Sequence, residues 1–177
     1  MPIRRKHIRS LAEECLARCS VSQAPIPVDR VVESYGITIC RAPTDDELSG
    51  FMYRDQELES AVIGVNADHS TNRQRFTLGH ELGHYLLHEQ EGVHVDRGYQ
   101  VKLRSSASSE GTNVEEQEAN LFAAELLMPA RFLKDDLAAT KPVDLEDEEV
   151  ISKLAKRYKV STQAMTFRLA FLKHIEL

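Results

Sequence analysis

The feature that most constrains the fold is a pair of histidines four residues apart in a segment with helical character. Residues 80–84 read His-Glu-Leu-Gly-His, and the predicted helix around them runs from about Asn72 to Glu89, with Ser70 or Thr71 as its N-cap. On a helix, residues i and i+4 lie on one face, about one turn apart. His80 and His84 can therefore hold one zinc ion, with Glu81 beside it. Zinc bound by two histidines needs a third protein ligand, so a second element must pack against this helix.

The third ligand does not follow a metzincin pattern. A metzincin would place its third histidine ten residues after the first, but residue 90 is Gln. A second predicted helix offers three acids instead: Glu115, Glu116 and Glu118. This helix is opened by a capping box at 112–115 and ends at Met128-Pro129.

Among these acids, Glu116 is the best candidate because Asn120 follows it on the same helix face. The pair is similar to the thermolysin-type arrangement, in which a polar side chain four residues after the ligand Glu hydrogen-bonds a zinc-bound histidine. We therefore predict that Glu116 binds zinc, that Asn120 supports a histidine, and that Glu118 is solvated.

Such a site predicts peptide-bond hydrolysis, because zinc lowers the pKa of a water and polarises a carbonyl. Glu81 is the expected general base. A further donor to the oxyanion is expected, and Tyr53, Tyr99 and His94 are all candidates. Cys40 could act as a zinc ligand in a latent state, although a buried strand residue is the simpler interpretation. His88 fits a packing or supporting role, because helical drift moves it off the ligand face.

The remaining pattern predicts an α+β fold. Three β-rich runs, at 37–40, 50–53 and 61–65, are joined by short connections and predict a small three-stranded antiparallel sheet. The run at 61–65 is expected at an edge, where an extended substrate could add as a strand. An amphipathic helix precedes the sheet at 8–19, and residues 90–111 read as a long irregular segment. We predict a zincin-like domain over 1–140 and a helical, helix-turn-helix-like extension over 141–177.

Charge adds a competing hypothesis. The 177 residues carry 28 acids and 22 Lys and Arg, a net charge of −6, but residues 150–177 are basic and residues 110–149 are strongly acidic. The basic helices at the end allow a DNA-binding regulator, or a protein that binds a repressor without cutting it. Three cysteines suggest a reducing compartment. The absence of a long apolar run predicts a cytoplasmic protein with no membrane partner.

Residues 74–84 (QRFTLGHELGH) together with residues 116–129 (EQEANLFAAELLMP) closely resemble the ImmA/IrrE family of zinc metallopeptidases. The likeness extends to Val65-Asn66 and to residues 154–169, and so covers most of the chain. The resemblance implies one bound zinc ion and cleavage of a helix-turn-helix repressor. Such cleavage relieves repression in stress, DNA-damage, phage-defence or mobile-element responses. A nucleic-acid or small-molecule signal is a candidate activator.

Overall fold

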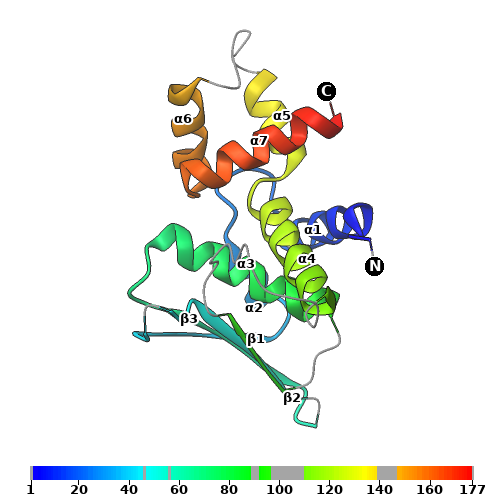
Figure 1. Ribbon diagram of the computed structural model, residues 1–177, viewed down its shortest axis with the longest axis vertical. Coiled ribbons are helices and arrows are strands. Elements are labelled where there is room, and N and C mark those ends of the chain that lie inside the picture. The colour runs from blue at the N-terminus through cyan, green and yellow to red at the C-terminus, as the bar shows by residue number, and fades with distance from the viewer. Residues whose placement is uncertain are drawn as a thin grey trace.

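The fold is α+β, as predicted, and the computed structural model describes residues 2–45, 47–55, 57–88, 92–96, 110–138 and 147–176. Figure 1 shows the sheet at one end of the molecule, the C-terminal helices at the other, and α1, α3 and α4 between them. The elements are α1 (Arg5–Arg18), α2 (Val28–Glu33), β1 (Ile37–Ala42), β2 (Gly50–Asp55), β3 (Ser60–Asn66), α3 (Thr71–Leu87), β4 (Gly92–Asp96), α4 (Glu110–Leu127), α5 (Ala130–Ala138), α6 (Glu148–Tyr158) and α7 (Thr162–Glu176).

The sheet differs from the prediction of three antiparallel strands. It is mixed and four-stranded, with the order β1-β3-β2-β4. β2 pairs antiparallel with β3 and β4, whereas β1 pairs parallel with β3. The short connections suggested that strands adjacent in sequence would also be adjacent in the sheet. Instead, β2 lies one strand away from β1, and a gap between them is left for β3. The hairpin then returns β3 between the two earlier strands, and this crossing cannot be read from loop length.

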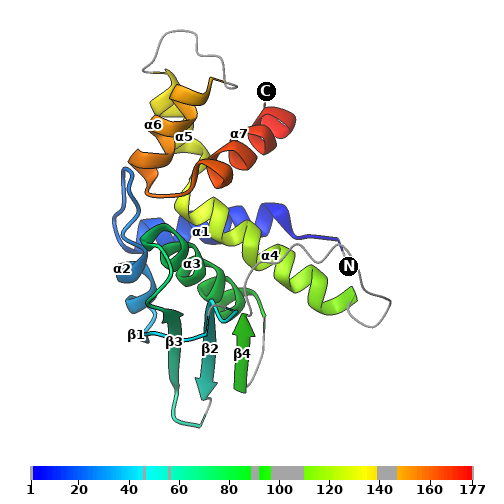
Figure 2. The ribbon, with the colours of Figure 1, turned by 60° about the vertical axis from the view of Figure 1, so that its left-hand side comes forward.

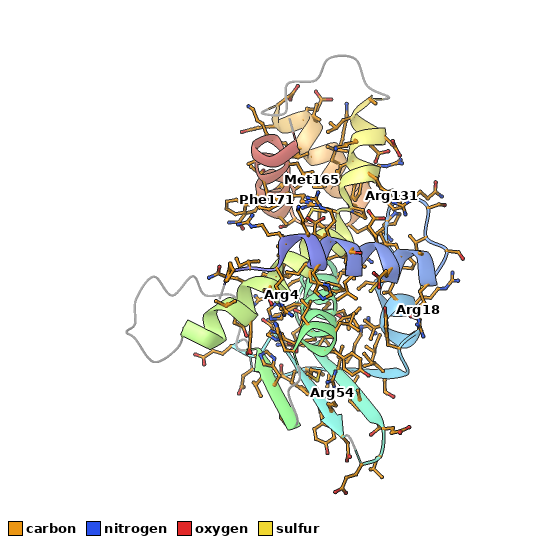
Figure 3. The ribbon with its side chains drawn as sticks, turned by 90° about the vertical axis from the view of Figure 1, so that its right-hand side faces the viewer. Arg4, Arg18, Arg54, Arg131, Met165 and Phe171 are labelled. Carbon is orange, nitrogen blue, oxygen red and sulfur yellow. The ribbon has the colours of Figure 1, made fainter. Side chains whose placement is uncertain are left out.

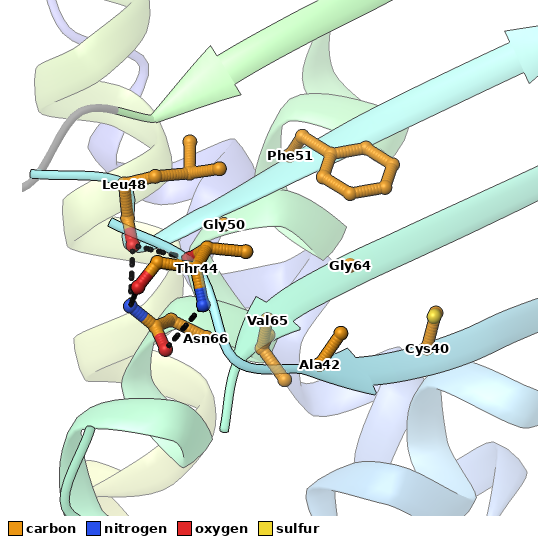
Figure 4. A pocket seen from close by; sticks show the side chains of 9 residues that line it. All are labelled: Cys40, Ala42, Thr44, Leu48, Gly50, Phe51, Gly64, Val65 and Asn66. Atoms are coloured by element: carbon orange, nitrogen blue, oxygen red, sulfur yellow. Dashed lines mark hydrogen bonds between the residues drawn. The ribbon is translucent and has the colours of Figure 1, made fainter. Parts of the chain in front are cut away.

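A buried asparagine organises that crossing. Asn66, at the end of β3, is 1% exposed. Its amide nitrogen donates to the carbonyls of Thr44, Asp45 and Leu48, and its amide oxygen accepts from the backbone N–H of Thr44. Figure 4 shows Asn66 reaching into this loop. The side chain thus replaces the backbone partners that the loop lacks, and fixes where β2 begins.

The place of β4 overturns a second expectation. The predicted edge strand at 61–65 is β3, which lies in the interior of the sheet between β1 and β2. The edge next to the histidine helix is instead formed by β4, within the stretch 90–111 that we expected to be irregular. β4 spans only five residues, and so short a run shows too few alternations of apolar and polar side chains to be recognised as a strand in the sequence.

One face of the sheet forms part of the core. Met52, Ile63 and Val65 are at most 3% exposed and share a face of the sheet with Gly50, where a Cβ would meet Thr77 and Glu81 of α3. Figures 1 and 2 show α3 lying along the sheet. The opposite face carries no helix from the described part of the chain. It includes Tyr53, Val93 and Val95, which are at least 37% exposed. The core therefore lies between the sheet and the layer of α1, α3 and α4.

Two predicted helix ends are confirmed. The hydroxyl of Ser70 accepts from the N–H of Arg73 at the start of α3. α4 ends at Leu127, directly before Met128-Pro129. The predicted capping box is wrong, because α4 already begins at Glu110 and residues 112–115 are helical. A capping pattern inside a helix has no free N–H groups to satisfy.

The C-terminal helices are anchored to the rest of the chain by buried polar contacts. Arg168 of α7 is 3% exposed and donates to both carboxylate oxygens of Glu125 on α4, at 2.9 and 2.5 Å. Near the start of α3, Arg75 donates to the carbonyl of Lys159, and Asn72 donates to that of Val160. The turn between α6 and α7 is thus bonded to the histidine helix.

The predicted boundary at residue 140 falls outside the described residues and stays a prediction. Within the described residues, no helix is long and apolar enough to cross a membrane.

The ion pair between Arg168 and Glu125 gives a stability prediction. Arg168→Ala would leave a carboxylate that is 4% exposed and, within the described residues, paired with Arg9 at 3.4 Å, an arginine whose side chain is 36% exposed. We expect a loss of about 3–5 kcal/mol in the free energy of unfolding, because an uncompensated charge stays buried. Arg157→Ala is the control: its pair with Asp136 involves an arginine side chain that is 51% exposed, and we expect a loss of about 1 kcal/mol or less. Urea denaturation measures both, and equal losses would contradict the prediction.

Candidate metal centre

The structure brings three predicted ligand atoms together. The Nε2 atoms of His80 and His84 lie 3.1 Å apart. Glu116 reaches both from α4, with its Oε2 3.4 Å from Nε2 of His80 and its Oε1 3.3 Å from Nε2 of His84. Both histidines are almost fully buried, whereas the Glu116 side chain is 43% exposed. The cluster thus has one side open to solvent.

The spacing of these atoms fits a metal ion. An ion in tetrahedral coordination with bonds of about 2.0–2.1 Å separates its ligand atoms by about 3.3 Å. The two imidazole nitrogens lie 3.1 Å apart, and each lies 3.3 or 3.4 Å from a different carboxylate oxygen of Glu116. One donor atom from each of the three side chains lies within 4.8 Å of the other two. Two imidazoles and one carboxylate are also a common donor set for a catalytic metal that keeps one position open. Among the described residues, these three form the group whose geometry could hold an ion.

The second nitrogen of each histidine ring is occupied elsewhere. Nδ1 of His80 lies 3.1 Å from the amide oxygen of Asn120, one turn after Glu116 on α4. Nδ1 of His84 lies 3.2 Å from Nδ1 of His88. Each ring is therefore oriented by a partner on the side away from Glu116, and its Nε2 faces the cluster.

Glu118 does not lie in solvent, contrary to the expectation from its helix position. Its side chain is 4% exposed and bonded to Arg4, whose guanidinium approaches to 2.6 Å. These hydrogen bonds lower the pKa of Glu118 to about 2. α4 packs against both α3 and α1, so two of its faces are buried. A prediction from helical periodicity that assumes one buried face therefore does not detect burial on the second face of α4.

Glu81 lies beside the cluster, fully buried, with Oε2 3.2 Å from Nδ1 of His94 on β4. Nε2 of the same imidazole lies 3.1 Å from Oε1 of Glu116, and its ring stacks on that of His84 with centroids 3.8 Å apart. Burial opposes a charge on His94, but the contacts with Glu116 and Glu81 outweigh it and raise its pKa to about 10. Burial lowers the pKa of His84 to about 4, which keeps this ring neutral as a ligand must be.

The other sequence candidates lie elsewhere. Tyr53 is on the open face of the sheet, where its hydroxyl contacts Asp55. Cys40 is exposed on β1, separated from β4 by two strands, and lines a shallow hollow beside Phe51 (Figure 4). Tyr99 is outside the described residues. Of the three proposed oxyanion donors, His94 is the one that the described structure brings to the cluster.

The ligands converge because α3 and α4 approach closely. Gly83 faces the backbone of Ala119: a methyl group on Gly83 would lie 3.1 Å from the Cα and 3.2 Å from the carbonyl oxygen of Ala119. One turn earlier, a methyl group on Gly79 would lie 3.3 Å from the Cβ of Ala123. Small residues on both helices thus allow Glu116 to reach the histidines.

Comparison with known proteins identifies the family of the chain. The family model of the IrrE N-terminal-like domain, a peptidase family, matches residues 32–170, which include the whole cluster. The chain belongs to this family. Its relatives include the radiation response metalloprotease IrrE of Deinococcus deserti, 33% identical over 115 residues. They also include the metallopeptidase ImmA of Bacillus subtilis, 27% identical over 95 residues. This membership confirms the ImmA/IrrE resemblance seen in the sequence.

The matches cover these proteins only in part. The alignment with IrrE spans 63% of this chain and 37% of IrrE, and that with ImmA spans 51% and 48%. A solved Mycobacterium tuberculosis transcriptional regulator has a similar fold, with a TM-score of 0.57 and 13% sequence identity. That match covers 90% of this chain and 45% of the regulator. The chain thus spans less than half the length of these relatives.

The close helix contact gives a graded prediction. Gly83→Ala places its methyl group against backbone, which cannot rotate away, and so pushes Glu116 from the histidines. We expect metal affinity to fall about 10-fold or more, as it does when groups around a site are displaced. Gly79→Ala meets a side-chain methyl at a slightly longer distance and should cost less. Competition with a chelator measures both. Unchanged affinity in Gly83→Ala would show that the contact does not set the ligand spacing.

Proposed function

We propose that this protein is a zinc-dependent endopeptidase. The observation that carries the proposal is the convergence of donor atoms from His80, His84 and Glu116 within 4.8 Å of one another, next to the buried carboxylate of Glu81. We assign one zinc ion to this site. When bound, the ion supplies a Lewis acid for the scissile carbonyl and lowers the pKa of a nearby water.

In this proposal, the side chains move protons and hold charge. The carboxylate of Glu81 accepts the proton of the attacking water and later delivers it to the leaving amine. His94 contacts Glu81 and Glu116 and is the best-placed donor to the oxyanion. Asn120 accepts from Nδ1 of His80, which holds that ring in orientation.

The proposed substrate is a helix-turn-helix transcriptional repressor. This rests on membership of the IrrE N-terminal-like family and on the likeness to ImmA and IrrE, one of which is named for a radiation response. Cleavage would relieve repression in a stress, DNA-damage, phage-defence or mobile-element response, under control of a nucleic-acid or small-molecule signal. We further propose that an extended segment of the repressor adds to β4, which forms the sheet edge and carries His94.

The alternative, a regulator that binds DNA or a repressor without proteolysis, draws on the basic charge of α6 and α7. The turn between these helices is bonded to Asn72 and Arg75 of α3. In a helix-turn-helix, DNA contacts come from the start of the second helix, directly after this turn. The anchored turn therefore favours a structural role for the pair in support of the peptidase site.

Glu81→Gln tests the proteolytic function. The amide keeps the shape of the side chain but cannot act as a base, so cleavage of a repressor should fall by about 10²–10⁴-fold. Zinc content should stay at one ion per chain, because Glu81 is not among the ligands. Glu57→Gln, in an exposed loop beside the sheet, is the control and should cleave like the wild type. Electrophoresis of helix-turn-helix repressors incubated with each variant gives the rates. A wild type that cleaves none of them would leave the binding alternative.

Glu116→Ala tests the metal assignment. Removal of one of three ligands should weaken zinc binding by about 100-fold or more, a larger effect than displacement of a supporting group. Glu115→Ala removes the preceding carboxylate, which is not in the cluster, and should leave affinity unchanged. Titration against a zinc chelator separates the two variants. Equal affinity of Glu116→Ala and wild type would exclude Glu116 as a ligand.

A further inference from the structure

A chain of buried polar side chains leads away from the metal centre on the side opposite Glu116. Nδ1 of His84 lies 3.2 Å from Nδ1 of His88, and Nε2 of His88 lies 3.3 Å from Oε2 of Glu118. The side chains of His88 and Glu118 are each 4% exposed. Glu118 in turn accepts from the backbone N–H of Arg4 at 2.9 Å and from the Arg4 guanidinium at 2.6 Å. Arg4 directly precedes α1 (Figure 3).

On the side away from Glu116, these contacts favour one arrangement of protons if each ring carries a single proton. The Glu118 carboxylate, paired with Arg4, can only accept, so Nε2 of His88 must carry its proton. A neutral imidazole has one donor and one acceptor, so Nδ1 of His88 accepts. Nδ1 of His84 then donates, and Nε2 of His84 turns its lone pair toward Nε2 of His80 and Oε1 of Glu116, at 3.1 and 3.3 Å. The competing tautomer would place a proton on Nε2 and donate it to Glu116. A metal ion needs the tautomer of His84 with its proton on Nδ1.

We propose that His88, Glu118 and Arg4 form a relay that fixes His84 in its metal-binding tautomer and orientation. The inference rests on the proposed function, in which His84 is a metal ligand. All three are positioning residues, since none of them is among the proposed ligands. His80 has a simpler partner in Asn120, so the two ligand histidines are held by different means.

The relay also joins distant parts of the chain. The Arg4 guanidinium donates to the carbonyl of Leu87, the last residue of α3, as well as to Glu118 on α4. His88 follows Leu87 with an extended backbone, which ends the helix and turns the side chain back toward His84. The segment before α1 therefore stabilises the end of the metal-binding helix. If His88 only filled space, any side chain of similar volume could replace it, whereas the relay needs both of its ring nitrogens. Variants of His88 can therefore distinguish the two roles.

Nitrogen NMR of the metal-free protein tests the relay directly. Long-range ¹⁵N–¹H spectra distinguish the two tautomers of a histidine. We expect the proton of His84 on Nδ1 and the proton of His88 on Nε2. The opposite tautomer of His84 would overturn the proposal. This measurement needs neither zinc nor a substrate, so its result does not depend on whether the wild type binds zinc. A wild type that binds no zinc would refute the proposed function but would leave the assignment of the two tautomers intact.

Zinc affinity at constant pH tests the consequence. His88→Leu keeps an apolar volume but neither accepts nor donates, so we expect zinc to bind about 10- to 100-fold more weakly. His88→Gln can accept and donate, and should recover most of the lost affinity. Affinity of His88→Leu equal to that of the wild type would overturn the relay. So would equally weak binding by both variants, because packing alone would explain it.

A matched pair on α4 separates the relay from general loss of stability. Glu118→Gln and Glu125→Gln each remove the charge from a carboxylate whose side chain is 4% exposed and paired with an arginine. We expect both to lower the melting temperature of the metal-free protein, but only Glu118→Gln to weaken zinc binding and to mix the tautomers of His84. If both variants bind zinc equally well, the relay is refuted.

Discussion

The close contact between α3 and α4 is the constraint on which the metal centre depends. Two ligands come from α3 and the third from α4, so the distance between the helix axes decides whether one ion can touch all three. Gly79 and Gly83 on one helix, with Ala119 and Ala123 on the other, remove the side chains that would hold the backbones apart. None of these four residues has a reactive side chain, yet their contact determines the spacing between Glu116 and the two histidines.

The local part of the site could be predicted from the sequence. His80 and His84, and likewise Glu116 and Asn120, are separated by four residues on helices, and helical geometry alone places each pair on one face. The parts that failed depend on neighbours that are distant in sequence. Glu118 is buried because α1 covers a second face of α4. His88 reaches His84 because the helix ends just before it. Neither fact has a signature in a single segment.

In the sheet, too, the local features could be predicted from the sequence and the long-range arrangement could not. The three strand segments were recognised from their composition, but their order was not, because β3 inserts between β1 and β2. This order is accompanied by hydrogen bonds of Asn66 with Thr44, Asp45 and Leu48, which lie some twenty residues earlier and have no signature in the strand segments. The short β4 escaped notice although its His94 was a candidate for the site. A functional residue was thus identified before the element that positions it.

The helix that carries both ligand histidines is held along its whole length. Asn72 and Arg75 bond its first turns to the turn between α6 and α7, α4 packs on its middle, and Arg4 donates to the carbonyl of its last residue, Leu87. The conformational entropy of the ligands is therefore largely lost when the chain folds, before any ion arrives. In the proposed function, such a site is a rigid chelate that selects an ion by its radius and preferred geometry. This contrasts with a zinc finger, in which the ion itself orders the chain.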